Sequence, residues 1–123
     1  METTQAVGRT LISISAATAI YDQIQAIAER NGETHNDASQ RLIREGRKVF
    51  WERIRTESPS RVLDTYRASI EALGHDAMTD WVIETDRPTV NRVRLTAHEF
   101  EQTTNEFSVG VLLQALGLLV SQE

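Results

Sequence analysis

A change of hydrophobic period near residue 17 is the feature that most limits what this chain can fold into. Residues 9–16 alternate, with Ile12 and Ile14 on one parity and Ser13 and Ser15 on the other, which is typical of a short half-buried strand. From residue 18 the apolar residues recur every three or four positions, as in an amphipathic helix. Because one strand with its helices cannot bury its own inner face, the pattern predicts that a second copy of the chain supplies the pairing strand.

Three helices are expected before residue 75. The first covers residues 18–31 and ends at Gly32, because glycine adopts the left-handed cap conformation at little cost. The second begins near residues 34–36 and runs to about residue 55. The third follows the break at Ser58-Pro59, where serine can cap and proline is tolerated in the first turn, and ends at Gly74.

The pattern after residue 74 is mixed. Residues 81–85 and 90–96 read as strands separated by a turn at 86–88. A TAHE capping pattern predicts that a helix starts at Ala97, and the apolar stretch 107–120 is expected to be helical. The sequence shows no clear repeat, although residues 92–100 resemble the first strand where it enters its helix.

Charge is distributed unevenly along the 123 residues. The net charge is −5, but residues 1–57 hold eight basic and eight acidic side chains, and the remainder holds five and ten. The absence of cysteine excludes disulfides and thiolate chemistry, and no apolar run is long enough to span a bilayer. We expect a cytoplasmic protein of one modest domain, or a minimal module plus an appendage.

The order strand, helix, glycine turn and longer helix resembles the ribbon-helix-helix family of Arc, MetJ and CopG-like DNA-binding proteins. The most specific stretches are 34–38 (THNDA) and 41–46 (RLIREG), and the resemblance covers about residues 9–50. It implies a mainly helical fold with short strands, in which two chains intertwine as a homodimer. The two paired strands then form a ribbon that enters the major groove of double-stranded DNA.

The resemblance also implies two sets of contact residues. The residues expected to face the groove are those on the polar parity of the strand. The residues expected to bind phosphate lie at the start of the second helix, where free N–H groups meet the positive end of the helix dipole. The expected base contacts are Arg9, Leu11, Ser13 and Ser15. The expected phosphate contacts are Thr34, His35, Asn36 and Arg44, with Asn36 also expected to cap its helix.

The second half is interpreted as a separate unit. Residues 1–57 form the DNA-binding and dimerisation domain, and residues 58–123 form a small α+β appendage whose apolar helix, 109–120, joins dimers into tetramers or binds a protein partner. An alternative stays open. The segment that contains Arg92 and Arg94 is followed by an expected helix, as the first strand is, and in this alternative the two arginines belong to a second DNA-reading ribbon.

No catalytic, metal or cofactor site is expected. The three histidines lack metal-ligand spacing, and the acidic residues between 76 and 86 have no nucleophile or phosphate loop beside them. We therefore expect a dimeric, repressor-like, sequence-specific DNA-binding regulator. The competing interpretation is an antitoxin, or a plasmid relaxosome or partition accessory protein, whose C-terminal half binds a protein partner.

Overall fold

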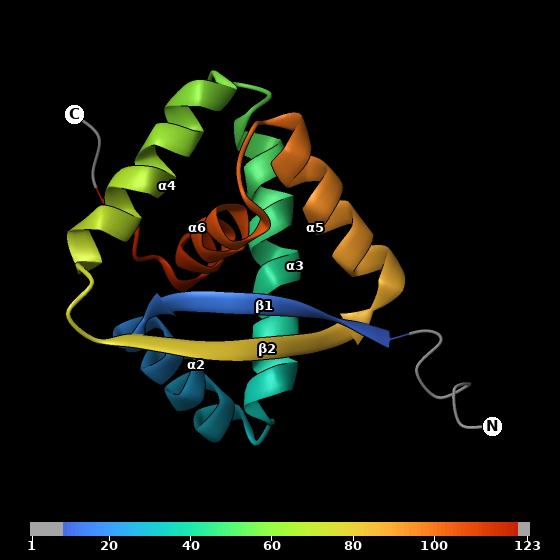
Figure 1. Ribbon diagram of the computed structural model, residues 1–123, viewed down its shortest axis with the longest axis vertical. Coiled ribbons are helices and arrows are strands. Elements are labelled where there is room, and N and C mark those ends of the chain that lie inside the picture. Colours follow the sequence, from blue (N-terminus) through green and yellow to red (C-terminus); the bar gives the residue numbers. More distant parts are fainter. Residues whose placement is uncertain (1–8, 121–123) are drawn as a thin grey trace.

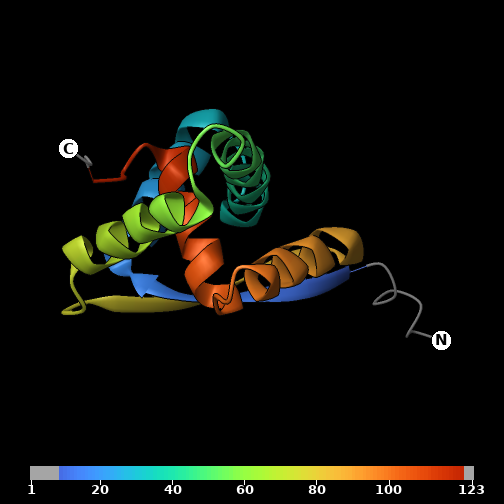
Figure 2. The same ribbon diagram turned by 90° about the horizontal axis from the view of Figure 1, so that it is seen from above.

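The computed structural model describes residues 9–120, which form a mainly helical structure with one two-stranded antiparallel sheet (Figure 1). The elements of this part of the chain are β1 (Arg9–Ala17), α2 (Thr18–Asn31), α3 (His35–Arg53), α4 (Pro59–Leu73), β2 (Met78–Asp86), α5 (Arg87–Glu99) and α6 (Thr104–Leu116). Seen from above, the sheet forms one outer layer and the helices lie behind it (Figure 2).

Residues 9–74 form the strand and the three helices that their local signals predict. Gly32 ends α2 with φ of 68°, a left-handed conformation that a β-carbon would disfavour. The hydroxyl of Thr34 caps α3 by accepting a hydrogen bond from the backbone N–H of Asp37 (3.0 Å). Ser58 caps α4 in the same way, with Pro59 in the first turn.

The turn expected at residues 86–88 and the strand expected at 90–96 are wrong. Asp86 ends β2, and residues 87–99 form α5, which the Asp86 carboxylate caps by accepting a hydrogen bond from Thr89 N–H (3.2 Å). The buried side chains of α5 include Val90, Val93 and Ala97, whose spacing of three and four is helical. The capping box lies at Thr103–Glu106 instead of at the TAHE pattern, and it starts α6.

Within the single chain, β1 pairs with β2, whereas the sequence predicted a strand of a second copy as its partner. The register joins Arg9 to Asp86, Ser13 to Val82 and Ala17 to Met78. The strand predicted at residues 81–85 is therefore confirmed and extends over 78–86. Ile12 and Ile14 (2% exposed each) are buried together with Ile83. A single chain therefore buries the apolar face of the sheet, which a lone strand could not do.

α6 runs through the middle of the core and does not form an exposed interface. All residues from Phe107 to Leu113 are buried, and α6 packs against α3, α4, α5 and β1. A mainly apolar sequence suits this position because this part of the helix is covered on every side. The two halves divided at residue 57 therefore share one hydrophobic core.

The chain contains a structural repeat that local sequence patterns did not reveal. β1, α2 and α3 recur as β2, α5 and α6, and each later element starts 69 positions after its counterpart. With this offset, Ser13 of β1 corresponds to Val82 of β2, and these two residues are also paired with each other at the centre of the register. A pseudo-twofold axis therefore passes between them. Glu101 (φ 59°) occupies the place of Gly32, which explains why its backbone is left-handed. α4 is the element without a counterpart.

The helices α3 and α6 approach each other closely at Gly46 of α3. A β-carbon there would lie 2.0 Å from the carbonyl oxygen of Val111 in α6. A contact this short with backbone cannot be relieved by a rotamer change, so the helices would have to separate.

We predict that Gly46→Ala lowers the free energy of unfolding by about 3 kcal/mol, because it over-packs the α3–α6 crossing. Urea denaturation followed by circular dichroism measures the loss. Lys48→Ala, an exposed change on the same helix, is the matched control and should stay within about 0.5 kcal/mol of the wild type. A neutral Gly46→Ala would contradict the helix crossing described above.

Candidate nucleic-acid interface

The outer face of the β1–β2 ribbon is not covered by helices, which all lie on the other side of the sheet (Figures 1 and 2). Side chains directly opposite each other in an antiparallel pair share one face, so the register brings alternate residues of both strands together. The central rows of this outer ribbon face contain Leu11, Ser13, Ser15, Asp80, Val82 and Glu84, all exposed. The predicted exposure of Leu11, Ser13 and Ser15 is confirmed, whereas the side chain of Arg9 lies outside the described residues.

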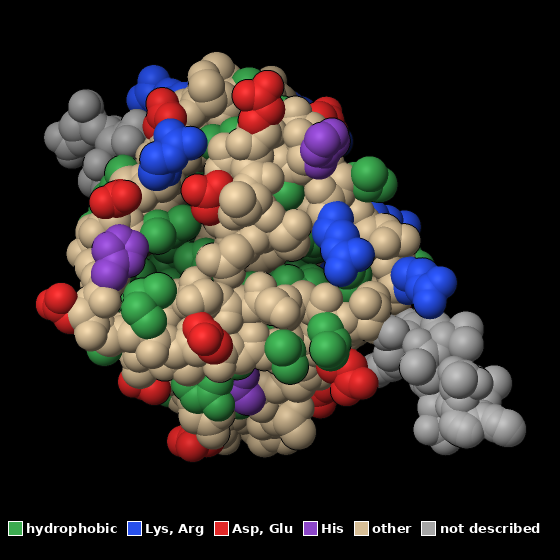
Figure 3. Space-filling view, in the orientation of Figure 1, with side chains coloured by type: hydrophobic (Ala, Val, Ile, Leu, Met, Phe, Trp, Pro, Cys, Tyr) green, Lys and Arg blue, Asp and Glu red, His purple; other side chains and the backbone are tan. Residues whose placement is uncertain are grey.

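The outer ribbon face combines carboxylates with apolar groups. Leu11 (47% exposed) and Val82 (50% exposed) are its apolar centre, and Glu84 and Asp80 lie opposite Leu11 and Ser15. Among the described side chains of this face there is no lysine or arginine. Figure 3 shows the result: acidic and hydrophobic side chains lie along the ribbon, and basic side chains lie beside it over α5.

Each outer edge of the ribbon is held by an asparagine from the start of a helix. The side-chain amide of Asn36, in α3, donates to the carbonyl oxygen of Glu84 (2.9 Å) and accepts from its N–H (2.7 Å). Asn105, in α6, makes the same pair with Ser15, at 3.0 and 2.8 Å. The two asparagines are 69 positions apart, so these two edge clamps are related by the pseudo-twofold axis.

The expected capping role of Asn36 is therefore wrong. Thr34 caps α3, and Asn36 sits inside the first turn with its amide committed to the strand edge, where edge N–H and C=O groups would otherwise lack a partner. The clamps place the starts of α3 and α6 at opposite edges of the ribbon. Asp37 and Glu106 lie in these first turns, so each positive helix end already has a carboxylate beside it.

His35 packs inside the structure and does not project from it. Its ring stacks on Tyr21 (centroids 4.0 Å apart) and meets the edge of Trp81 (5.8 Å). Its Nε2 lies 3.3 Å from the Tyr21 carbonyl oxygen, and its Nδ1 lies 3.4 Å from the Ser39 hydroxyl. Burial lowers the pKa of His35, and the hydrogen bond to the Tyr21 carbonyl opposes that shift. Both ring nitrogens thus have partners within the protein.

The remaining arginines singled out in the sequence lie on helices. Arg44 is exposed on α3. Arg92 and Arg94 are exposed on α5, so the alternative in which they read DNA from a strand is wrong. The second ribbon strand does exist, but it is β2, which precedes them.

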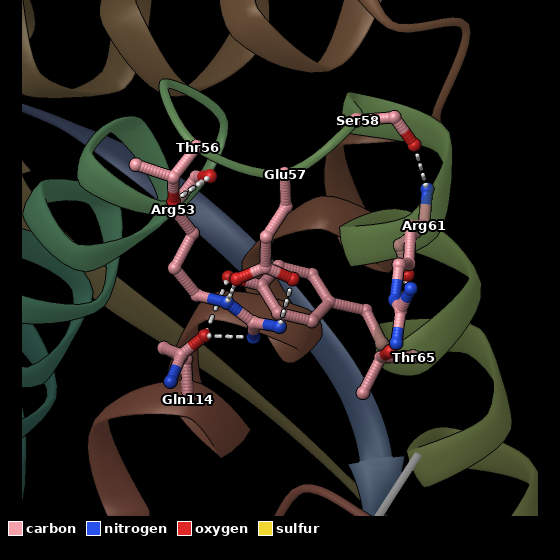
Figure 4. Close-up of polar contacts among 8 residues, drawn as sticks. Arg53, Thr56, Glu57, Ser58, Arg61, Thr65 and Gln114 are labelled. Atoms are coloured by element: carbon pink, nitrogen blue, oxygen red, sulfur yellow. Dashed lines mark hydrogen bonds and ion pairs between the residues drawn. The ribbon is translucent and has the colours of Figure 1, made fainter. Parts of the chain in front are cut away.

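A separate polar cluster joins α3, α4 and α6 (Figure 4). Arg53 makes two hydrogen bonds to Glu57 (2.9 Å each) and a third to the amide oxygen of Gln114 (2.9 Å), which also accepts from the Tyr66 hydroxyl (3.1 Å). Burial raises the pKa of Tyr66, so its phenol stays protonated and keeps donating. Since each group has a partner, the cluster links the three helices.

A cavity of about 340 Å³ lies at one end of the ribbon and is lined by residues of β1, α4 and α6. Apolar side chains such as Ile70 and Val109 line it, and Asn105 and Glu106 stand among its polar groups. No equivalent of α4 exists on the other side of the pseudo-twofold axis, so this hollow is a feature of one half only.

Comparisons with known proteins return no match to a family model, a curated protein or a solved structure. Within residues 9–120 no three histidine or acidic side chains are grouped as a metal site requires. Over the same residues, no helix has the length and apolar character needed to cross a bilayer.

We predict that Asn36→Ala and Asn105→Ala each lower the free energy of unfolding by about 1–3 kcal/mol, since each removes two hydrogen bonds from a strand edge. Asn36→Asp should lose less, because it removes the donor but keeps the acceptor for Glu84 N–H. Chemical denaturation measures these losses, with Asn91→Ala, exposed on α5, as the control of little effect. Loss at only one clamp would contradict the symmetry of the two edges.

We predict that stability falls as the pH drops below about 6.5, the ordinary pKa of histidine. The pKa of His35 is lower in the folded protein than in the unfolded chain, so the unfolded chain takes up the proton first and is stabilised by it. The contribution is fully present above the unfolded pKa and is lost as the pH falls toward the folded one. Urea midpoints at pH 7.5 and 5.5 measure it.

The control variants separate His35 from the exposed histidines. His35→Gln should make the urea midpoint less sensitive to pH over this range, whereas His98→Gln should keep the wild-type dependence. An unchanged pH dependence in His35→Gln would show that another group is responsible.

Proposed function

We propose that this chain binds double-stranded DNA by inserting the β1–β2 ribbon into the major groove, and that it acts as a regulator of the repressor type. The observation that carries the proposal is the ribbon itself: two antiparallel strands with exposed outer side chains, each edge clamped to the start of a helix. Strands lie about 5 Å apart, and the major groove is about 12 Å wide, so such a ribbon fits it.

The helix starts support the same geometry. α3 and α6 begin at opposite ribbon edges, where a bound duplex would bring its two phosphate backbones. Free N–H groups at a helix start are suited to phosphate oxygens. Thr34 and Thr103, the two caps, occupy equivalent places there. Of the phosphate contacts expected from the sequence, Thr34 and the exposed Arg44 remain in the proposal, whereas His35 and Asn36 use their polar side-chain atoms within the protein.

The two strands would read different base edges, so the proposed site is not a palindrome. Ser13 and Ser15 on β1 can donate or accept, and Leu11 can pack on a thymine methyl group. Asp80 and Glu84 on β2 can accept from the amino group of cytosine. A single chain carries both strands, so one molecule would recognise one asymmetric site without dimerising first.

The charge of the face limits the affinity. Asp80 and Glu84 repel phosphates, and the basic side chains beside the ribbon belong to α5, where Arg87 and Arg94 are exposed (Figure 3). Because the salt dependence of binding scales with the phosphates neutralised, at a slope of about 0.9 each, we expect a shallow dependence on salt. Base and shape contacts would then carry more of the specificity than charge.

A second candidate function, binding of a protein partner through the same face, is favoured by one observation. The outer ribbon face combines two carboxylates with exposed Leu11 and Val82, a composition that would suit a basic surface with an apolar centre. The variants below distinguish the two candidates.

The test is selection of duplexes from a random pool by the purified chain, followed by fluorescence anisotropy across a salt series. We predict that the combined change Ser13→Ala and Ser15→Ala reduces the preference for selected over random duplex by about tenfold, since it removes two base-reading hydroxyls. Ser60→Ala, an exposed serine at the start of α4, should bind like the wild type.

A second pair of changes tests the carboxylates. Asp80→Asn with Glu84→Gln should tighten binding to random duplex and weaken discrimination at cytosine positions, because repulsion and an acceptor are both removed. Failure of the wild type to prefer any duplex, with the fold intact, would refute DNA binding and leave the protein-binding candidate.

A further inference from the structure

The cavity at one end of the ribbon has the size of a small-molecule site. Its volume of about 340 Å³ is many times what one water molecule needs, whereas protein interiors leave few voids above that size. Pockets that hold small molecules begin at about 300 Å³. Figure 3 shows the hollow between α4 and the ribbon, with hydrophobic side chains at its floor.

The pseudo-twofold axis shows that the apolar lining belongs to this end of the ribbon alone. Three apolar residues of the lining, one each from β1, α2 and α6, have polar counterparts 69 positions away at the other end. Ala16, Ile20 and Val109 correspond to Thr85, Thr89 and Gln40. The repeated backbone therefore does not itself require apolar residues at these positions.

α4 completes the lining from the opposite side. It contributes the buried ring of Tyr66 and the half-buried side chain of Ile70. Tyr66 is held in place, because its hydroxyl donates to Gln114 (3.1 Å) and its ring lies against Gly110, where a β-carbon would come within 2.4 Å of it. The apolar walls are thus fixed by contacts outside the cavity, which suits the apolar body of a ligand.

The charged groups of the lining are mainly acidic. Glu71 of α4 and Glu106 of α6 are exposed, and neither takes part in an ion pair within residues 9–120. Arg67, the arginine of the lining, pairs with Asp64 on its own helix (3.1 Å). Glu106 uses Oε1 to accept from Thr103 N–H (3.0 Å), so its second oxygen can accept from another donor.

We propose that this cavity binds a small amphipathic amine. The apolar body of the amine lies against Ile20, Ile70 and Val109, and its ammonium group is directed toward the carboxylates of Glu71 and Glu106. An ammonium group has three donors and makes charge-assisted hydrogen bonds to carboxylates, whereas a carboxylic acid of the same shape would be repelled. The site lies beside the ribbon and does not use its outer face, so it is independent of DNA binding.

The test titrates the full chain with two probes of equal length, 4-phenylbutylamine and 4-phenylbutyrate, at constant ionic strength. The isoleucine methyl signals in ¹H–¹³C spectra report binding, with Ile20 and Ile70 in the lining and Ile43, buried in the core outside it, as the internal control. We expect saturable shifts of Ile20 and Ile70 with the amine, and an affinity for the amine about tenfold higher than for the acid.

A charge variant tests the polar end of the site. Glu71→Gln should weaken binding of the amine about threefold, the effect of losing one exposed ion pair, and should narrow the preference over the acid. Glu99→Gln is the matched control, because it removes the same charge at an exposed position of α5 outside the lining. It should bind both probes as the wild type does.

A filling variant tests the apolar end. Ile70→Phe should abolish binding of the amine while the urea midpoint stays at or above that of the wild type, because the ring enters existing space. A large fall of that midpoint would show that the space is absent. That result would overturn the proposal, as would a wild type without saturable shifts, equal affinity for the two probes, or unchanged amine binding in Ile70→Phe.

Discussion

Antiparallel pairing of β1 with β2 is the interaction on which the remaining structure depends. It places Ile12, Ile14 and Ile83 on one side, where the helices cover them, and leaves the alternate side chains facing solvent. A one-residue change of register would exchange the two faces, so the buried isoleucines fix the register firmly. Once the ribbon is set, its two free edges need partners, and the clamps of Asn36 and Asn105 provide them from the starts of α3 and α6.

Supplying both strands from one chain changes what the ribbon can be. In a homodimer the two strands are identical, and any surface they make is symmetric. Here the backbone keeps a pseudo-twofold axis, but the outward side chains differ between the two strands. β1 presents Leu11, Ser13 and Ser15, and the equivalent positions of β2 are Asp80, Val82 and Glu84. Dimerisation is no longer needed to bury the strands. The freedom gained is an asymmetric surface, which is the basis of the proposed recognition of an asymmetric duplex.

Charge is segregated on the surface of the fold. The outer ribbon face carries Asp80 and Glu84, whereas Arg87, Arg92 and Arg94 are exposed on α5. The net charge of −5 hides this arrangement, because it averages over surfaces that do not touch the same partner.

Local sequence determined the first half of the fold and the composition of β1's outer face. Alternation placed Ser13 and Ser15 outward, and Gly32, Thr34 and Ser58 marked helix ends, since these signals act within a few residues.

Only the tertiary structure decided that β1 pairs with a strand some 60 residues away, that residues 87–99 are a helix capped by Asp86, that α6 is core, and that Asn36 clamps an edge. The repeat was hidden because few equivalent positions keep the same residue: Asn36 and Asn105 do, but Trp81 stands in the place of Ile12 and Glu101 in that of Gly32. Pairing over such a separation depends on which faces fit together, and no local pattern records that.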